Sequence, residues 1–152
     1  SHYRGGELTG TLNGYYPNGQ LRVSGDYENG KESGTFKGYY DNGQPSYLLV
    51  YAAGEKVGEH ITYYPNGQMN TRIHFDKNLQ VGDAESFYDT GALAVKGTYV
   101  ADKKEGAFTF YDSKKEPIAI EHYKNDTLIS REMLREDPQN KPSNFDTLLK
   151  SY

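Results

Sequence analysis

The sequence predicts an all-β protein: an elongated, curved, single antiparallel meander sheet of about ten strands, built from 24-residue β-hairpin repeats. Two observations predict this fold. Five glycines are spaced 24 residues apart, at Gly10, Gly34, Gly58, Gly82 and Gly106. Turn residues and aromatic residues recur in phase with these glycines. A fixed period of this length is the signature of a repeat architecture.

The composition fits a thin sheet whose apolar surface is supplied by tyrosine. The 152 residues include 15 Tyr and 17 Gly but no Cys or Trp, and the net charge is −4. Because a buried ring removes on the order of 150–250 Å² from water, tyrosines can replace much of an aliphatic core. The absence of Cys excludes disulfides, thiolate metal sites and cysteine nucleophiles. The absence of a basic cluster argues against nucleic acid as a partner and against membrane association.

Each repeat reads as two strands joined and followed by short turns. In the first repeat, residues 11–16 and 21–27 are the expected strands, and the turns contain Asn18-Gly19 and Asn29-Gly30. Asn-Gly between extended apolar runs is a strong hairpin signal. We expect a repeat array over residues 1–137, with repeats that start at 10, 34, 58, 82 and 106 and a partial repeat over 3–9. Residues 127–137 fit either a last strand or a helical turn.

The fifth repeat departs from the pattern. Phe110 and Tyr111 arrive one residue earlier than the paired aromatics of the other repeats, and no turn glycine follows them. This leaves the fifth hairpin in doubt. Residues 138–142 are rich in helix breakers, and Ser143-Asn144 can cap a short helix with an apolar stripe. We therefore expect a linker and a C-terminal capping helix over 138–152, with a partner-docking helix as the alternative.

The register within a hairpin allows two interpretations. A two-residue loop at Asn18-Gly19 pairs Gly10 with Tyr27 and sorts the strands into an apolar face and a charged face, with Arg22 on the charged face. Pro17 instead suits a three-residue loop that ends in a left-handed glycine, which shifts the pairing by one residue. We favour the first register because it separates charged from apolar side chains.

The repeat unit resembles the MORN repeat, in its bacterial variant form. The matching segments are GTLNGYYPNGQLRVSGDYENGKESG at residues 10–34 and GEHITYYPNG at residues 58–67. This variant occurs in proteins labelled YwqK-type antitoxins and in many secreted or lipid-anchored bacterial proteins. The resemblance implies a β-hairpin array of bacterial origin, with a secreted or envelope-associated location preferred. An antitoxin role is implied by the family label alone.

No catalytic or metal-binding constellation is apparent. In the favoured register His60 and His74 point to opposite faces, and His74 lies opposite Glu59. No Ser-His-Asp arrangement, phosphate-binding loop or calcium loop is present. We expect no metal, no cofactor and no enzymatic activity.

The candidate binding residues are the four rings that the favoured register places on the charged face. They are Tyr15, Tyr39, Tyr63 and Phe87. They recur every two strands, about 9.6 Å apart, and either pack on their neighbours or bind a ligand. The leading hypothesis is a non-catalytic scaffold that binds another protein. The alternative is a carbohydrate or cell-envelope binding module that uses the aromatic ladder. We also expect either further repeats upstream of the partial repeat or edge-to-edge pairing between chains.

Overall fold

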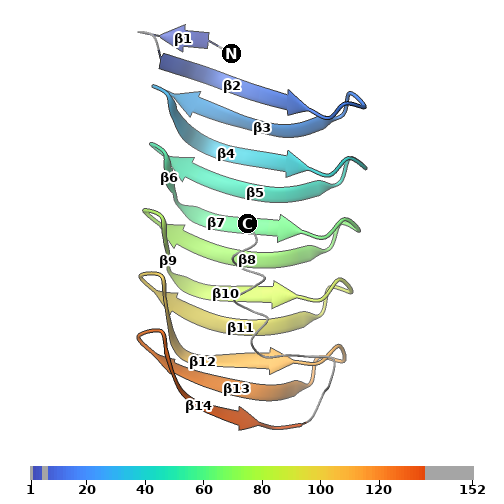
Figure 1. Ribbon diagram of the computed structural model, residues 1–152, viewed down its shortest axis with the longest axis vertical. Coiled ribbons are helices and arrows are strands. Elements are labelled where there is room, and N and C mark those ends of the chain that lie inside the picture. Colours follow the sequence, from blue (N-terminus) through green and yellow to red (C-terminus); the bar gives the residue numbers. More distant parts are fainter. Residues whose placement is uncertain (1, 5–6, 136–152) are drawn as a thin grey trace.

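The computed structural model describes residues 2–4 and 7–135, and every regular element in that part of the chain is a β-strand. The strands form one antiparallel sheet in which neighbours in sequence are neighbours in space, stacked along the longest axis of the molecule (Figure 1). The strands are β1 (His2–Arg4), β2 (Glu7–Tyr15), β3 (Leu21–Glu28), β4 (Lys31–Tyr39), β5 (Pro45–Ala52), β6 (Glu55–Lys56), β7 (Gly58–Tyr63), β8 (Met69–Asp76), β9 (Leu79–Gln80), β10 (Gly82–Phe87), β11 (Leu93–Val100), β12 (Lys103–Tyr111), β13 (Pro117–Lys124) and β14 (Thr127–Met133).

The five repeats supply the ten main strands that the sequence predicts. The partial first repeat adds β1, and residues 127–133 add β14 as a strand rather than a helical turn. The short strands β6 and β9 pair with β5 and β8, beside the main path of the sheet. The predicted linker and capping helix at 138–152 lie outside the described residues.

The 24-residue glycine marks a kink in the first strand of each repeat. At Gly34 the backbone φ is +71°, a left-handed value that favours glycine. Around this point the pairing of β3 with β4 jumps from Asp26–Ser33 to Ser24–Lys37, so that three residues of β4 oppose the single residue Gly25. The same values of φ recur at the equivalent glycines of the next three repeats, with Gly58 at +69°, Gly82 at +72° and Gly106 at +79°.

Both expected registers occur in the hairpin. The three-residue loop forms at the turn, and the charge-sorted pairing holds in the strands beyond it. At the turn, Gly19 has a φ of +88° and donates its N–H to the Tyr16 carbonyl, as in a three-residue loop. A β-bulge follows, and beyond it Gly14 pairs with Val23 and Gly10 with Tyr27, as the charge-sorted register predicts. The bulge adds one residue to β3, and this residue is Arg22.

The bulge overturns the predicted face of two residues beside the turn. Leu21 lies opposite Tyr15 on the charged face, whereas the favoured register placed it on the apolar face. Arg22 moves the other way: its Nη2 lies 3.3 Å from where a Cβ on Gly14 would sit, on the apolar face. The same bulge recurs in the next four repeats at Ser46, Asn70, Ala94 and Ile118.

The core lies on the apolar face and is densest toward the C-terminal repeats. Its buried side chains are Ile73, Ala84, Ala94, Val95, Tyr99, Phe108, Phe110, Ile118 and Ala119. Rings on neighbouring strands meet edge to face along this face, as between Tyr27 and Phe36 at 5.5 Å and between Phe108 and Tyr123 at 5.3 Å. Edge-to-face contacts of this kind add to the stabilisation that burial itself provides.

The fifth hairpin forms, and the apparent slip in its sequence is an error of interpretation. Lys115 takes the turn position of the missing glycine with a φ of +70°. Tyr111 ends β12 opposite Pro117, in the place that Phe87 occupies opposite Leu93 one repeat earlier. The repeat therefore stays in phase, and Asp112 replaces the second ring of the pair.

Candidate functional site

Five aromatic side chains occupy one register position at the turn end of the charged face. We call them the ring row: Tyr15, Tyr39, Tyr63, Phe87 and Tyr111. Each ends the first strand of its repeat and lies opposite the first residue of the second strand. Those opposing residues are Leu21, Pro45, Met69, Leu93 and Pro117. The turn end of the charged face is therefore an apolar strip.

The first four members of the ring row are the residues that the sequence singled out. Tyr111 was missed because its repeat was interpreted as slipped by one residue. The signal was present, since Tyr111 follows Phe87 by 24 residues. Tyr15 is 59% exposed, and the other four rings are partly buried. The row therefore presents ring surface to solvent while resting on its own sheet.

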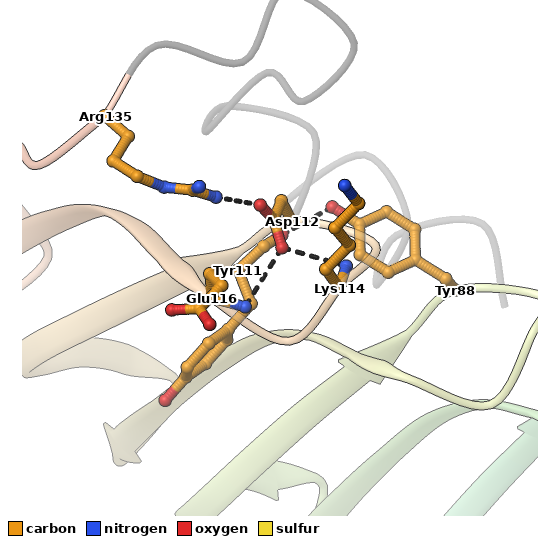
Figure 2. A network of polar contacts seen from close by, with 6 residues as sticks. All are labelled: Tyr88, Tyr111, Asp112, Lys114, Glu116 and Arg135. Carbon is orange, nitrogen blue, oxygen red and sulfur yellow. Dashed lines mark hydrogen bonds and ion pairs between the residues drawn. The ribbon is translucent and has the colours of Figure 1, made fainter.

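Hydrogen bonds on the apolar face fix the spacing of the ring row. The Tyr16 hydroxyl donates to the Tyr39 carbonyl at 2.5 Å, and Tyr40 does the same to Tyr63 at 2.5 Å. Tyr64 donates to Phe87 at 2.6 Å, and Tyr88 to Tyr111 at 2.5 Å (Figure 2). Each ring-row residue after Tyr15 is thus held through its own carbonyl by the preceding repeat.

Hydrogen bonds also connect each of these hairpin tips to the tip of the following repeat. The side-chain amide of Asn42 donates to the Pro65 carbonyl at 3.2 Å, and that of Asn66 donates to the Asp89 carbonyl at 2.7 Å. The tips consequently lie one above another along one side of the sheet (Figure 1). The ring row runs beside these tips, so hydrogen bonds between repeats hold the strand ends that carry the rings.

Two aliphatic side chains adjoin the middle of the ring row, and one of them, Ile61, is buried. Leu48 and Ile61 pair across β5 and β7 on the charged face. A hollow of about 220 Å³ lies between the rings of Tyr39 and Tyr63, with Pro45 and Leu48 among its walls. This hollow lies directly beside the ring row.

The charges next to the ring row are mostly basic. Lys37 and Lys96 lie in the adjoining row of residues on the same face, and neither forms an ion pair with another described residue. Arg72 lies in the same row and pairs with Glu85, and this hydrogen bond raises the pKa of the guanidinium. Glu85 lies in this row too, directly opposite both Arg72 and Lys96, while Asp26, Glu59 and Asp83 stand one row further from the rings.

The histidines are placed as the sequence predicts. His74 pairs with Glu59 across the strands, with 3.8 Å between His74 Nε2 and Glu59 Oε2 on the charged face. His60 lies on the apolar face, is 5% exposed, and has its Nε2 3.0 Å from the Val50 carbonyl oxygen. Burial lowers the pKa of His60. Within residues 2–4 and 7–135, no three His, Asp or Glu side chains are grouped so that they could hold a metal ion.

Two buried carboxylates of the last repeat form structural ion pairs. Asp112 is 7% exposed, and its Oδ1 accepts backbone N–H bonds from Lys114 at 2.9 Å and Glu116 at 3.0 Å. Its Oδ2 pairs with Arg135, which reaches over it from the end of β14 (Figure 2). Glu121 is 2% exposed and binds Arg131 of β14. These contacts close the C-terminal end of the apolar face.

One family model matches the chain, and its description is the MORN repeat variant. It matches four consecutive stretches, at residues 8–31, 32–53, 56–77 and 80–101, which together cover more than half of the chain. The fifth repeat, in which Asp112 and Lys115 replace the second ring and the turn glycine, lies outside these stretches. No curated protein matches the sequence. No helix in the described part of the chain is long and apolar enough to cross a membrane.

Proposed function

The chain belongs to the MORN repeat variant family, and we propose that it is a non-catalytic scaffold that binds another protein through its ring row. Repeats of this kind generally act as protein-binding or membrane-binding modules. The observation that carries the proposal is the ring row itself, with five rings at a fixed spacing on the charged face and aliphatic residues between them. Aromatic and Met side chains are enriched at the centres of protein interfaces.

The residues between the rings favour a protein over a carbohydrate. A sugar presents hydroxyl groups in the plane of its ring, so a sugar-binding platform needs polar side chains beside its aromatic ones. Here the neighbours of the rings include Leu21, Pro45 and Met69, which offer no side-chain donors. Such a surface suits the apolar side chains of a peptide better than it suits a glycan.

An antitoxin-like role and an envelope-associated role are both special cases of this proposal. In either case the chain acts by occupying a partner, and the identity of that partner distinguishes the two. The net charge of −4 and the acidic residues Asp26, Glu59 and Asp83 of the charged face disfavour an anionic membrane as the surface that is bound.

Site-specific photo-crosslinking tests the proposal. A photoreactive phenylalanine analogue replaces Tyr63 in one protein and Val100 in another, and both are exposed to extract of the source organism. Val100 is the matched control because it is 57% exposed and ends β11 at the opposite end from Leu93, which lies beside the ring row. We expect a discrete crosslinked protein from position 63 and none from position 100. Equal crosslinking at both positions would overturn the proposal.

A further inference from the structure

We propose that the segment bound by the ring row is a proline-rich chain in the polyproline II conformation, lying along the array and across the strands. This inference rests on the proposed function and adds the chemical class of the partner. Three features of the charged face support it: the period of the rings, the chemistry of the spaces between them, and the position of two lysines.

The period of the rings matches the period of polyproline II. Successive members of the ring row are two strands apart, which is about 9.6 Å at a strand spacing of about 4.8 Å. A polyproline II helix has three residues per turn and a rise of about 3.1 Å, or about 9.3 Å per turn. Every third residue of such a chain therefore meets the next ring, and the mismatch over four intervals is only about 1 Å.

The side-chain repeats of other peptide conformations do not match the spacing of the ring row. A β-strand repeats its side-chain direction every two residues, or about 6.8 Å. An α-helix presents one stripe about every seven residues, or about 10.5 Å, so it drifts by nearly 1 Å at each ring. The ring row therefore selects a polyproline II chain by its period.

The spaces between the rings suit prolines and their carbonyl groups. The hollow between Tyr39 and Tyr63 is walled by Pro45 and Leu48, an apolar surface of the kind on which proline rings pack. A polyproline II chain has no internal hydrogen bonds, so its carbonyls need donors from outside. Within the described part of the chain, the hydroxyls of Tyr15, Tyr39 and Tyr63 have no hydrogen-bond partner and are available to donate.

The lysines beside the row add a charge requirement. Lys37 on β4 and Lys96 on β11 flank the ring row five strand spacings apart, which is about 24 Å. A polyproline II chain covers that distance in about eight residues, and with three residues per turn the nearest spacing that keeps two side chains on one face is about nine residues. Arg72 between the lysines is paired with Glu85, and neither lysine forms an ion pair with another described residue, so the best partner carries two acidic residues about nine positions apart.

Fluorescence anisotropy with the full chain and synthetic peptides tests this inference. The probe is a labelled 15-residue peptide with proline at every third position and two glutamates about nine residues apart, on one face of the polyproline II helix. Its control has the same composition with the prolines at irregular spacing. We expect the periodic peptide to bind at least tenfold more tightly than the control, and Tyr39→Ala with Tyr63→Ala to weaken binding at least tenfold. Val100→Ala leaves the affinity unchanged.

Two further variants keep the test valid if the double variant does not fold. Tyr15→Ala removes the most exposed ring, and Lys37→Ala with Lys96→Ala weakens binding of the glutamate peptide but not of its glutamine counterpart. Equal affinity for periodic and irregular peptides, or binding that no ring substitution alters, overturns the inference. If crosslinking at position 63 still captures a partner in that case, the proposed function stands and only the proline-rich class is wrong. Loss of the crosslink that is specific to position 63 would overturn both the proposed function and the proline-rich class of partner.

Discussion

The hydroxyl of Tyr16 donates a hydrogen bond of 2.5 Å to the backbone carbonyl of Tyr39, one repeat further along the array. Tyr15, the preceding residue, points to the opposite face and is 59% exposed. The paired aromatics of each repeat therefore have separate roles. The second ring connects its repeat to the next one, and the first ring belongs to the candidate binding surface.

Removing the two hydroxyls separately tests this division. We expect Tyr16→Phe to lower the free energy of unfolding by about 1 kcal/mol, because it leaves the Tyr39 carbonyl without this donor. Tyr15→Phe changes the same quantity by less than about 0.5 kcal/mol, as for an exposed substitution. Urea denaturation of both variants measures the difference. Equal losses would contradict the assignment of roles.

The close approach of Tyr47 to Gly38 gives a second prediction. A Cβ on Gly38 would lie 2.0 Å from Cε2 of Tyr47, so the ring must move if alanine is introduced. We expect Gly38→Ala to cost about 1–3 kcal/mol of unfolding free energy through overpacking. Gly14→Ala is the matched control in the first repeat, where the nearest atom is Val23 Cγ1 at 3.0 Å and the loss is smaller. A larger loss at Gly14 than at Gly38 would refute the packing explanation.

The period of 24 residues was enough to predict the sheet, its strand order and most of its pairing. The bulge at Arg22 was beyond the reach of pattern analysis, because the loop and the strand favour registers that differ by one residue. A charge-sorted pattern indicates the register of the strand, and Pro17 indicates that of the loop. Both registers occur in the folded chain because one extra residue, Arg22, lies between the loop and the paired part of the strand.

The position of the ring row on the charged face was predicted for four of its residues and missed for one. Tyr111 is in phase with Phe87, but Phe110 before it suggested that the aromatic pair had shifted. In the structure Phe110 is buried in the core and Asp112 takes the second position of the pair. The hollow between Tyr39 and Tyr63 could not be predicted from the sequence, since it depends on which aliphatic residues the bulge turns toward the rings.

The ion pair of Asp112 with Arg135 gives a third prediction. Asp112→Ala removes the acceptor of the Lys114 and Glu116 N–H groups as well as the partner of Arg135, so we expect a loss of about 2–3 kcal/mol. Arg135→Gln costs less, about 1 kcal/mol, because the arginine side chain is 47% exposed and the Asp112 carboxylate keeps its two backbone N–H donors. Denaturant unfolding of both variants and of the double variant measures the coupling. A larger loss for Arg135→Gln than for Asp112→Ala would contradict this ranking.

The burial of His60 gives a fourth prediction, a dependence of stability on pH. Burial is the main cause that lowers its pKa from the ordinary value of 6.5. The unfolded chain therefore binds a proton more readily than the folded one, and stability falls as the pH drops below about 6.5 toward the folded pKa. Well above pH 6.5 the imidazole is neutral in both states and contributes no slope. Unfolding free energies measured from pH 7.5 to 5.5 report this slope.

Replacing His60 measures how much of the pH dependence of the unfolding free energy is due to this residue. Phe36 and Phe108 occupy the equivalent position in the second and fifth repeats, so His60→Phe fits the pattern of the array. Below pH 6.5 we expect the variant to lose less stability than the unmodified chain, because it has no imidazole to protonate. His74→Gln is the control, since that ring is more exposed and sits beside Glu59. An identical pH profile for His60→Phe and the unmodified chain would show that the buried imidazole does not titrate with unfolding.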